Sequence, residues 1–125
     1  MRRSFAEWPT LVLLAGCYAV WGLGTTWIAQ TSLTAGIVVS ALATALHSSI
    51  THEVVHGHPF KSGRWNAALV FPALTLVIPY LRFRDTHLAH HRDSRLTDPY
   101  DDPESNYLDL AVWDRLPRAM QALLG

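Results

Sequence analysis

The hydrophobic and polar positions of this chain are unevenly distributed, and their pattern predicts membrane-spanning helices. After Glu7 the next acidic or basic residue, histidine aside, is Glu53, so Trp8 to His52 is a run of 45 residues without Asp, Glu, Lys or Arg. A transmembrane helix needs ~20 predominantly apolar residues, and the run is therefore long enough for two spans and a tight turn. We predict spans at about residues 9–29 and 35–50, with the polar sequence QTSLT as the turn.

Features within the run support two spans and an all-α integral membrane fold. Trp8 and Trp27 lie 19 residues apart, or ~28 Å along a helix, which suits the two interfacial belts of a bilayer. The second predicted span is rich in small residues, which allow close helix packing. A cleaved signal peptide is the alternative for residues 1–29, and Arg2 and Arg3 suit it. Its apolar part is too long, however, and a second span follows at once.

A third apolar run, residues 65–81, is predicted to be interfacial or re-entrant rather than a crossing. At ~25 Å it is marginal for a span, and Pro72 and Pro79 interrupt it. Both of its flanks are basic, so a crossing would place one basic pair outside. The positive-inside rule puts Arg2 and Arg3 in the cytoplasm, and two crossings return the chain there. Residues 82–125 then form a polar cytoplasmic tail, and the chain is a single membrane domain. If the protein is bacterial, the membrane is the inner membrane.

The overall composition narrows the choice of partners. The chain has 125 residues, with 10 basic and 10 acidic ones, so its net charge indicates neither nucleic acid nor an acidic partner. The single cysteine, Cys17, lies in the apolar run and offers no disulfide or cysteine-ligated zinc framework. The last 19 residues predict a short amphipathic helix, interrupted near Pro117. Arginines around the third apolar run are expected to contact lipid phosphates: Arg82, Arg84, Arg92 and Arg95.

All seven histidines fall between residues 47 and 91, and two groups among them have metal-binding spacing. His52 and His56 are four residues apart, so a helix presents both imidazoles on one face. The second group has the spacing H-x-x-H-H and comprises His87, His90 and His91. One zinc ion takes four ligands, so five clustered imidazoles indicate two metal ions or a higher coordination number. His47 and His58 are further candidates, less well placed by their spacing.

The sequence HEVVHGH at the end of the second predicted span, followed about 30 residues later by THLAHH, resembles the membrane fatty acid desaturase family. The resemblance covers roughly residues 35–110. It implies a non-haem di-iron centre that activates O2 and removes hydrogen from an acyl lipid to form a double bond. The iron ligands would be His52, His56, His87, His90 and His91, with no catalytic residue beyond them. Two electrons would come from a ferredoxin, rubredoxin or cytochrome-type donor, and neutral imidazole suits iron.

Several alternatives stay open at this point. The wider group includes alkane hydroxylases and carotenoid hydroxylases and ketolases, which use the same metal chemistry. H-E-x-x-H is also a zinc-protease signature, in which Glu53 would be the general base; that reading leaves the second group unexplained. A non-catalytic remnant is a third class. Family members carry a third histidine box, and no histidine follows His91. We therefore expect an N-terminal fragment, or a truncated product that cannot complete the site and is inactive alone.

Acidic residues near the two histidine groups, which we call the first and second histidine boxes, are candidates for orienting the ligand imidazoles. In the desaturase interpretation Glu53 supports a ligand instead of acting as a base, and Asp85 and Asp98 are further candidates for that role. The acidic stretch from Asp98 to Glu104 either docks an electron carrier or is a solvated loop, and the loop is the simpler interpretation.

Overall fold

The structure is a computed structural model that describes residues 7–75, 78–92 and 94–125. Every regular element among these residues is helical, which confirms the all-α prediction. The chain divides into two compact units, Met1–Arg84 and Asp85–Gly125, and each is described by itself. Arg2 and Arg3, on which the predicted orientation depends, lie outside the described residues.

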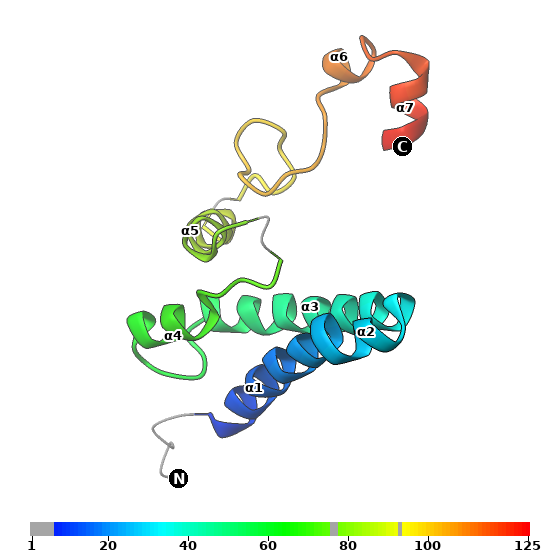
Figure 1. The fold of residues 1–125 in the computed structure, drawn as a ribbon. Helices are drawn as coiled ribbons and strands as arrows, with labels where there is room; N and C mark the ends of the chain where they lie inside the picture. Colours follow the sequence, from blue (N-terminus) through cyan, green and yellow to red (C-terminus); the bar gives the residue numbers. More distant parts are fainter. Residues whose placement is uncertain (1–6, 76–77, 93) are drawn as a thin grey trace. The chain divides into compact units, whose positions relative to one another are not determined.

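The first unit is built on a helical hairpin, shown in blue to green in Figure 1. Its first arm runs through α1 (Trp8–Leu23), the π-helical turn η1 (Gly24–Ile28) and α2 (Ala29–Thr31). Its second arm is α3 (Leu33–Val55). Ser32 alone separates the arms: its backbone is extended, and its Oγ accepts a hydrogen bond from the Ala35 N–H at 3.3 Å. This N-cap lets α3 begin within the predicted turn, and α3 continues five residues past the predicted end of the span.

Small residues let the two arms approach closely. A Cβ atom built at Gly36 would lie 2.8 Å from the Cα of Ala29 and 2.9 Å from the carbonyl oxygen of Gly24, so no larger residue fits without a shift of backbone. The side chains buried in this unit include Leu14, Cys17, Ala43 and Ile50. The predicted role of small residues in helix packing is therefore visible at this contact.

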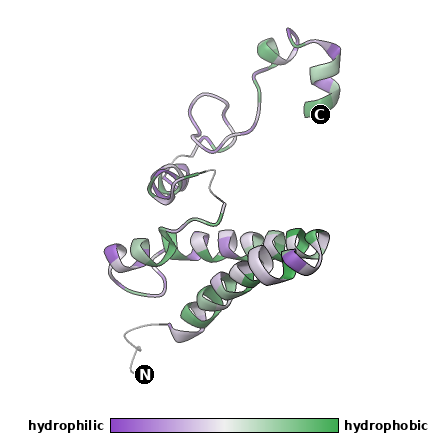
Figure 2. Cartoon of the chain, viewed as in Figure 1, coloured by the Kyte–Doolittle hydropathy of each residue, from purple (hydrophilic) through white to green (hydrophobic). Residues whose placement is uncertain are grey.

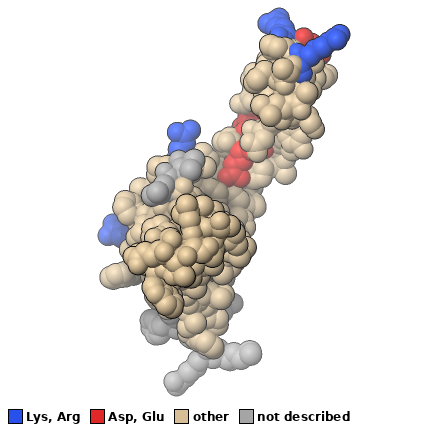
Figure 3. All heavy atoms as spheres, turned by 45° about the vertical axis from the view of Figure 1, so that its right-hand side comes forward, with Lys and Arg blue, Asp and Glu red and all other residues tan. Residues whose placement is uncertain are grey.

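Much of the hairpin consists of hydrophobic residues, coloured green in Figure 2, and many large apolar side chains are exposed on it. Val12, Trp27, Ile37 and Leu42 are 60%, 69%, 60% and 67% exposed, respectively. Residues Trp8–Thr31 and Leu33–Val55 are each long and apolar enough to cross a membrane. The stretch from Trp8 to His52 contributes no charged atom to the surface in Figure 3. Exposed apolar side chains of this number are stable when they face lipid instead of water.

The third apolar run is helical only in part. Helix α4 (Gly63–Val70) covers its beginning, and α5 (Tyr80–His90) starts at its end. The described residues between these helices form turns and bends around Pro72 and Pro79. Both prolines thus coincide with interruptions of the helical backbone, as their missing N–H groups require. The interfacial position of this segment stays a prediction.

The second unit begins in α5 and continues through an acidic loop into two short helices. These are α6 (Leu110–Trp113) and α7 (Arg118–Leu124). Pro117 is the N-cap of α7, which matches the predicted interruption of the C-terminal helix. The loop is a succession of turns in which carboxylates accept hydrogen bonds from backbone N–H groups, chiefly at Asp98 and Asp102.

Candidate metal centre

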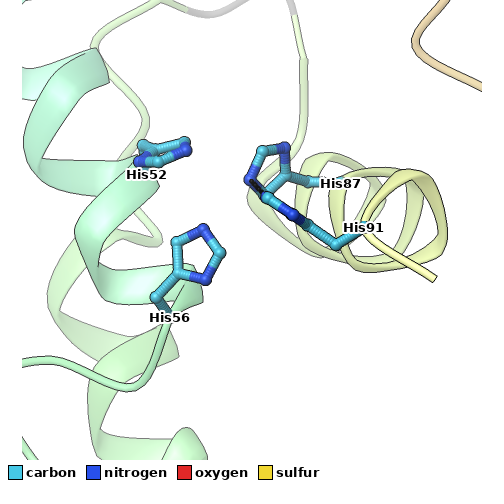
Figure 4. A group of neighbouring side chains, drawn as sticks. All are labelled: His52, His56, His87 and His91. Atoms are coloured by element: carbon cyan, nitrogen blue, oxygen red, sulfur yellow. Dashed lines mark hydrogen bonds between the residues drawn. The ribbon is translucent and has the colours of Figure 1, made fainter. Parts of the chain in front are cut away.

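The first histidine pair lies at the C-terminal end of α3. His52 is within the helix, and His56 is its C-cap residue. Their ring centroids are 4.8 Å apart, and both rings project from the same side of α3 (Figure 4). The spacing of four residues therefore has the predicted effect, because it keeps both imidazoles on one helical face.

The chain turns sharply after His56, and this turn keeps the next residues from continuing the helix. Gly57 has a φ of +96°, a conformation that side chains with a Cβ rarely adopt. The Gly57 N–H donates to the Val54 carbonyl at 3.1 Å, which closes the last turn. Farther along, Asn66 is 1% exposed and clamps the backbone of Phe60: it accepts from the Phe60 N–H at 3.0 Å and donates to its carbonyl at 2.8 Å.

The two additional histidine candidates have partners of another kind. His58 Nδ1 lies 2.7 Å from a carboxylate oxygen of Glu7, and the Glu7 N–H donates to the Pro59 carbonyl at 3.2 Å. His47 is 2% exposed, and its Nε2 lies 3.1 Å from the hydroxyl of Tyr18. Each of these histidines joins the α3 region to the first arm of the hairpin. Neither contact was anticipated, since the partners are 51 and 29 residues apart in sequence.

The second histidine group lies at the C-terminal end of α5. His87 Nε2 and His91 Nε2 are 3.1 Å apart. His91 follows the last helical residue, yet its N–H still donates to the His87 carbonyl at 3.1 Å, so the helical register extends to it. Figure 4 shows these two rings on the same side of the helix. The His90 ring centroid is 5.7 Å from that of His91 and 6.3 Å from that of His87.

Carboxylates from the acidic loop orient two members of this group. His87 Nδ1 lies 3.0 Å and 3.2 Å from the two carboxylate oxygens of Glu104. His90 Nδ1 lies 2.8 Å from a carboxylate oxygen of Asp102. A carboxylate accepts hydrogen bonds, so each Nδ1 carries the proton and each neutral imidazole keeps its lone pair on Nε2. Metal-binding histidines in proteins are commonly oriented by this kind of partner.

The environment of Asp102 favours its charged form. Its side chain accepts hydrogen bonds from the Glu104 N–H at 2.9 Å and the Thr97 N–H at 2.8 Å, besides contacting His90. The hydrogen bond from the Glu104 N–H lowers the pKa of Asp102 most, and those from His90 and the Thr97 N–H lower it further. This pKa falls to about 2, although burial raises it. The hydrogen bond that His90 donates to Asp102 in turn raises the pKa of His90. Asp102 is therefore a fixed negative charge beside the second group at neutral pH.

Of the acids expected to support the ligands, Glu53 lies beside His52, whereas Asp98 bonds backbone groups of its own loop. Asp98 accepts from the N–H groups of Tyr100 and Asp101 at 2.8 Å and 3.0 Å and so shapes the loop itself. Glu53 has a carboxylate oxygen 3.7 Å from His52 Nδ1, and both side chains are largely exposed. Sequence reasoning missed Glu104 and Asp102 as direct partners of histidine. The signal available for them was the acidic loop itself, which was interpreted as an electron-carrier dock or a solvated segment.

The donor atoms present fit a metal ion. The metal-binding candidates are His52 and His56 of the first unit and His87 and His91 of the second. The 3.1 Å separation of the two Nε2 atoms in the second unit is one that two metal–nitrogen bonds of ~2.0–2.1 Å can bridge. Imidazole nitrogens suit iron, zinc, copper and nickel, whereas magnesium and calcium prefer oxygen.

An all-helical chain with two membrane-length helices and paired histidine groups is typical of a membrane protein with a candidate metal site. Comparison with known families is more specific: the family model described as fatty acid desaturase matches residues 25–125. The chain therefore belongs to the fatty acid desaturase family. No curated protein and no solved structure is significantly similar to it. Membership assigns the chain to membrane proteins with oxidoreductase function of the desaturase type.

Proposed function

We propose that this chain binds a non-haem di-iron centre and acts in O2-dependent desaturation of an acyl chain at the membrane. The observation that carries the proposal is the second histidine group. Two Nε2 atoms lie 3.1 Å apart, and the Nδ1 of His87 is held by Glu104. This arrangement keeps the lone pair of His87 on Nε2, where a cation shared with His91 would bind. Membership in the fatty acid desaturase family supports the same conclusion.

The proposed ligands are the five histidines of the two boxes: His52, His56, His87, His90 and His91. Five imidazoles exceed the four ligands of a tetrahedral site, which favours two metal ions. The two units contribute a pair and a trio, and we propose that both bind the same centre. His47 and His58 are left out because their rings contact Tyr18 and Glu7.

Iron bound there would supply O2 activation and hydrogen abstraction from unactivated C–H bonds. The overall reaction converts –CH2–CH2– to –CH=CH– with one O2, two electrons and two protons, and it releases two waters. A ferredoxin, rubredoxin or cytochrome-type protein would deliver the electrons. Within this chain, Glu104 and Asp102 hold the Nδ1 protons of His87 and His90, so those imidazoles stay in one orientation.

The apolar hairpin would anchor the histidines at the membrane surface. α3 carries His52 and His56 in its last turns, directly after a stretch long and apolar enough to cross a bilayer. An acyl chain dissolved in lipid would reach the site without passing through water. We place both boxes on the cytoplasmic face, where soluble electron carriers are available. Hydroxylation by the same metal chemistry is distinguished from desaturation by the product.

Metal analysis of the purified chain in lipid nanodiscs tests the proposal. We expect iron and not zinc to bind after reconstitution, and about two iron ions per chain where the chain extends to the third histidine box expected for the family. His87→Ala should reduce the iron content strongly. His58→Ala is the matched control, because it removes an imidazole from the same region that pairs with Glu7. One zinc and no iron, or an unchanged iron content in His87→Ala, would overturn the proposal.

A further inference from the structure

A cavity of about 290 Å³ lies beside α3 in the first unit, directly before the first histidine box. One wall consists of three polar residues of α3, His47, Ser48 and Thr51. Among the residues that the structure describes, the other lining residues are mainly apolar: Ala73, Thr75, Ile78, Tyr80 and Phe83. The volume is close to the lower end of the range for small-molecule sites, ~300–1,000 Å³. Polar groups on one wall of an apolar cavity indicate a ligand that has one polar group.

Hydrogen bonds determine which nitrogen of His47 carries its proton. The Tyr18 hydroxyl donates to the carbonyl of Leu69 at 2.9 Å, near the C-terminal end of α4, where carbonyls lack helical partners. Because its proton is used there, the hydroxyl oxygen can only accept from His47 Nε2, which lies 3.1 Å away. The neutral ring then has its proton on Nε2 and its lone pair on Nδ1.

The lone pair on Nδ1 faces no donor within α3. Thr51 Oγ1 lies 3.4 Å from Nδ1, but the hydroxyl donates its proton to the backbone carbonyl of His47 at 2.8 Å. Nδ1 and Thr51 Oγ1 are therefore both acceptors toward the cavity. Ser48 and Thr75 carry hydroxyls, which can donate as well as accept. A ligand hydroxyl satisfies this wall best, since it donates to Nδ1 and accepts from a neighbouring hydroxyl, whereas a ketone can only accept.

The remainder of the ligand must be apolar and can extend beyond the cavity. A groove of about 660 Å³ in the same unit shares Ala73 and Ile78 with the cavity. Its other lining residues include Trp21, Phe71 and Leu74, from α1 and the segment that follows α4. An apolar tail too long for the smaller space can continue into this groove. Burying such a tail contributes ~0.8 kcal/mol per methylene group.

We propose that His47, with Thr51 and Ser48, forms a recognition site for the hydroxyl group of a single-chain apolar alcohol. Tyr18 is a positioning residue, because it acts on the ligand only through the protonation pattern of His47. The assignment of this alcohol as a substrate rests on the proposed function and widens its substrate from acyl chains to alkyl chains that carry a hydroxyl group. Binding of the alcohol is independent of iron and can be measured without it.

Photolabelling of the full chain in phosphatidylcholine nanodiscs tests this site. The probes are a ten-carbon primary alcohol with a mid-chain diazirine, the matching alkane and the matching methyl ketone. Label on the peptide that contains residues 73–83 is divided by label on α1 residues 8–16, which corrects for partition into lipid. One net hydrogen bond predicts a roughly 2–10-fold preference for the alcohol over the alkane. Equal labelling by alcohol and alkane would overturn the proposal.

Two variants separate recognition from structural support. Tyr18→Phe keeps the ring and removes the hydroxyl, so His47 is free to carry its proton on Nδ1, and the alcohol-to-ketone ratio should fall several-fold. Thr51→Val should halve the preference for the alcohol. Ser49→Ala is the matched control, because Ser49 bonds an i−4 carbonyl as Thr51 does but does not line the cavity. An unchanged alcohol-to-ketone ratio in Tyr18→Phe would contradict the assigned role of His47.

Competition and iron content distinguish the remaining outcomes. Unlabelled 1-decanol should displace the alcohol probe, whereas competition by diacylglycerol alone would contradict a single-chain ligand. Iron content is measured on the same wild-type samples. Alcohol-selective labelling without iron would leave the recognition site standing and the proposed function refuted. Two iron ions without alcohol-selective labelling would refute the recognition site and leave the proposed function standing.

Discussion

The two histidine boxes of this chain hold their imidazoles in different ways. His52 and His56 end a 23-residue helix that is long and apolar enough to cross a membrane. His87 and His90 belong to an 11-residue helix, and their Nδ1 atoms bond carboxylates of a loop that follows it. The first box takes its orientation from the helix and the turn that ends it. The second takes its orientation from acids 12 and 17 residues farther along the chain.

This difference shows that similar histidine spacings do not imply similar support. In the second box, a carboxylate determines which nitrogen carries the proton and which one is left for a metal. In the first box, the shape of the turn depends on Gly57 at φ +96° and on backbone hydrogen bonds. Substitution of an acidic residue should therefore affect mainly the second box. A substitution that changes the backbone conformation, such as one at Gly57, should affect mainly the first box.

The largest expected effect comes from removing the carboxylate that contacts His87. Glu104→Gln keeps the size of the side chain but removes its charge, and we expect iron affinity to fall by ~10–100-fold, the usual loss for such a partner of a metal ligand. Glu53→Gln is the matched control in the first box. Its exposed pairing with His52 at 3.7 Å should matter by less than ~3-fold. Titration against a competing chelator measures both, and equal losses would contradict the distinction between the boxes.

A smaller effect is expected from the turn after the first box. Gly57→Ala places a Cβ at φ +96°, which costs ~1–2 kcal/mol and should speed amide exchange in the turn by roughly 5–30-fold. Gly63→Ala is the control, because a Cβ there has nothing within 4 Å and the backbone is not left-handed. Hydrogen–deuterium exchange of residues 54–58 measures the change. Faster exchange in Gly63→Ala than in Gly57→Ala would refute the role of the turn.

The smallest effect is a pH dependence confined to the loop of the second box. The N–H groups of Tyr100 and then Asp101 lower the pKa of Asp98. The ionised Asp98 side chain therefore stabilises the fold by its full amount at pH values above the pKa that Asp98 has in the unfolded chain. This stabilisation is lost as the pH falls through the lower pKa that Asp98 has in the folded chain. We therefore expect the amides of Tyr100 and Asp101 to exchange faster from about pH 4 downward.

Asp98→Asn checks the cause of that pH dependence. An asparagine side chain accepts the same two hydrogen bonds without titrating in this range. Its exchange rates, corrected for the intrinsic effect of pH, should be flat where those of the wild-type chain rise. The turn after the first box provides the comparison, because the N–H groups of His56, Gly57 and His58 donate to backbone carbonyls, which do not titrate. A wild-type profile as flat as that of the variant would exclude Asp98 as the source.

The sequence by itself determined the features that depend on local periodicity and composition. A 45-residue run without acidic or basic residues predicted the membrane-length hairpin, and the i, i+4 spacing predicted that His52 and His56 share a helical face. Pro72, Pro79 and Pro117 marked interruptions of helices because proline lacks an N–H. These inferences need only the geometry of a single element, which short stretches of sequence specify.

Tertiary structure decided which polar groups meet. The contacts of Glu104 with His87, Glu7 with His58 and Tyr18 with His47 join residues 17 to 51 positions apart. Asp98 and Glu104 belong to the same acidic loop, yet Glu104 bonds His87 whereas Asp98 accepts from backbone N–H groups of the loop. Periodicity does not specify such pairs, because they depend on how a loop returns and how two helices pack. The sequence therefore predicted the metal-binding residue type and spacing, whereas the fold selected the groups that orient it.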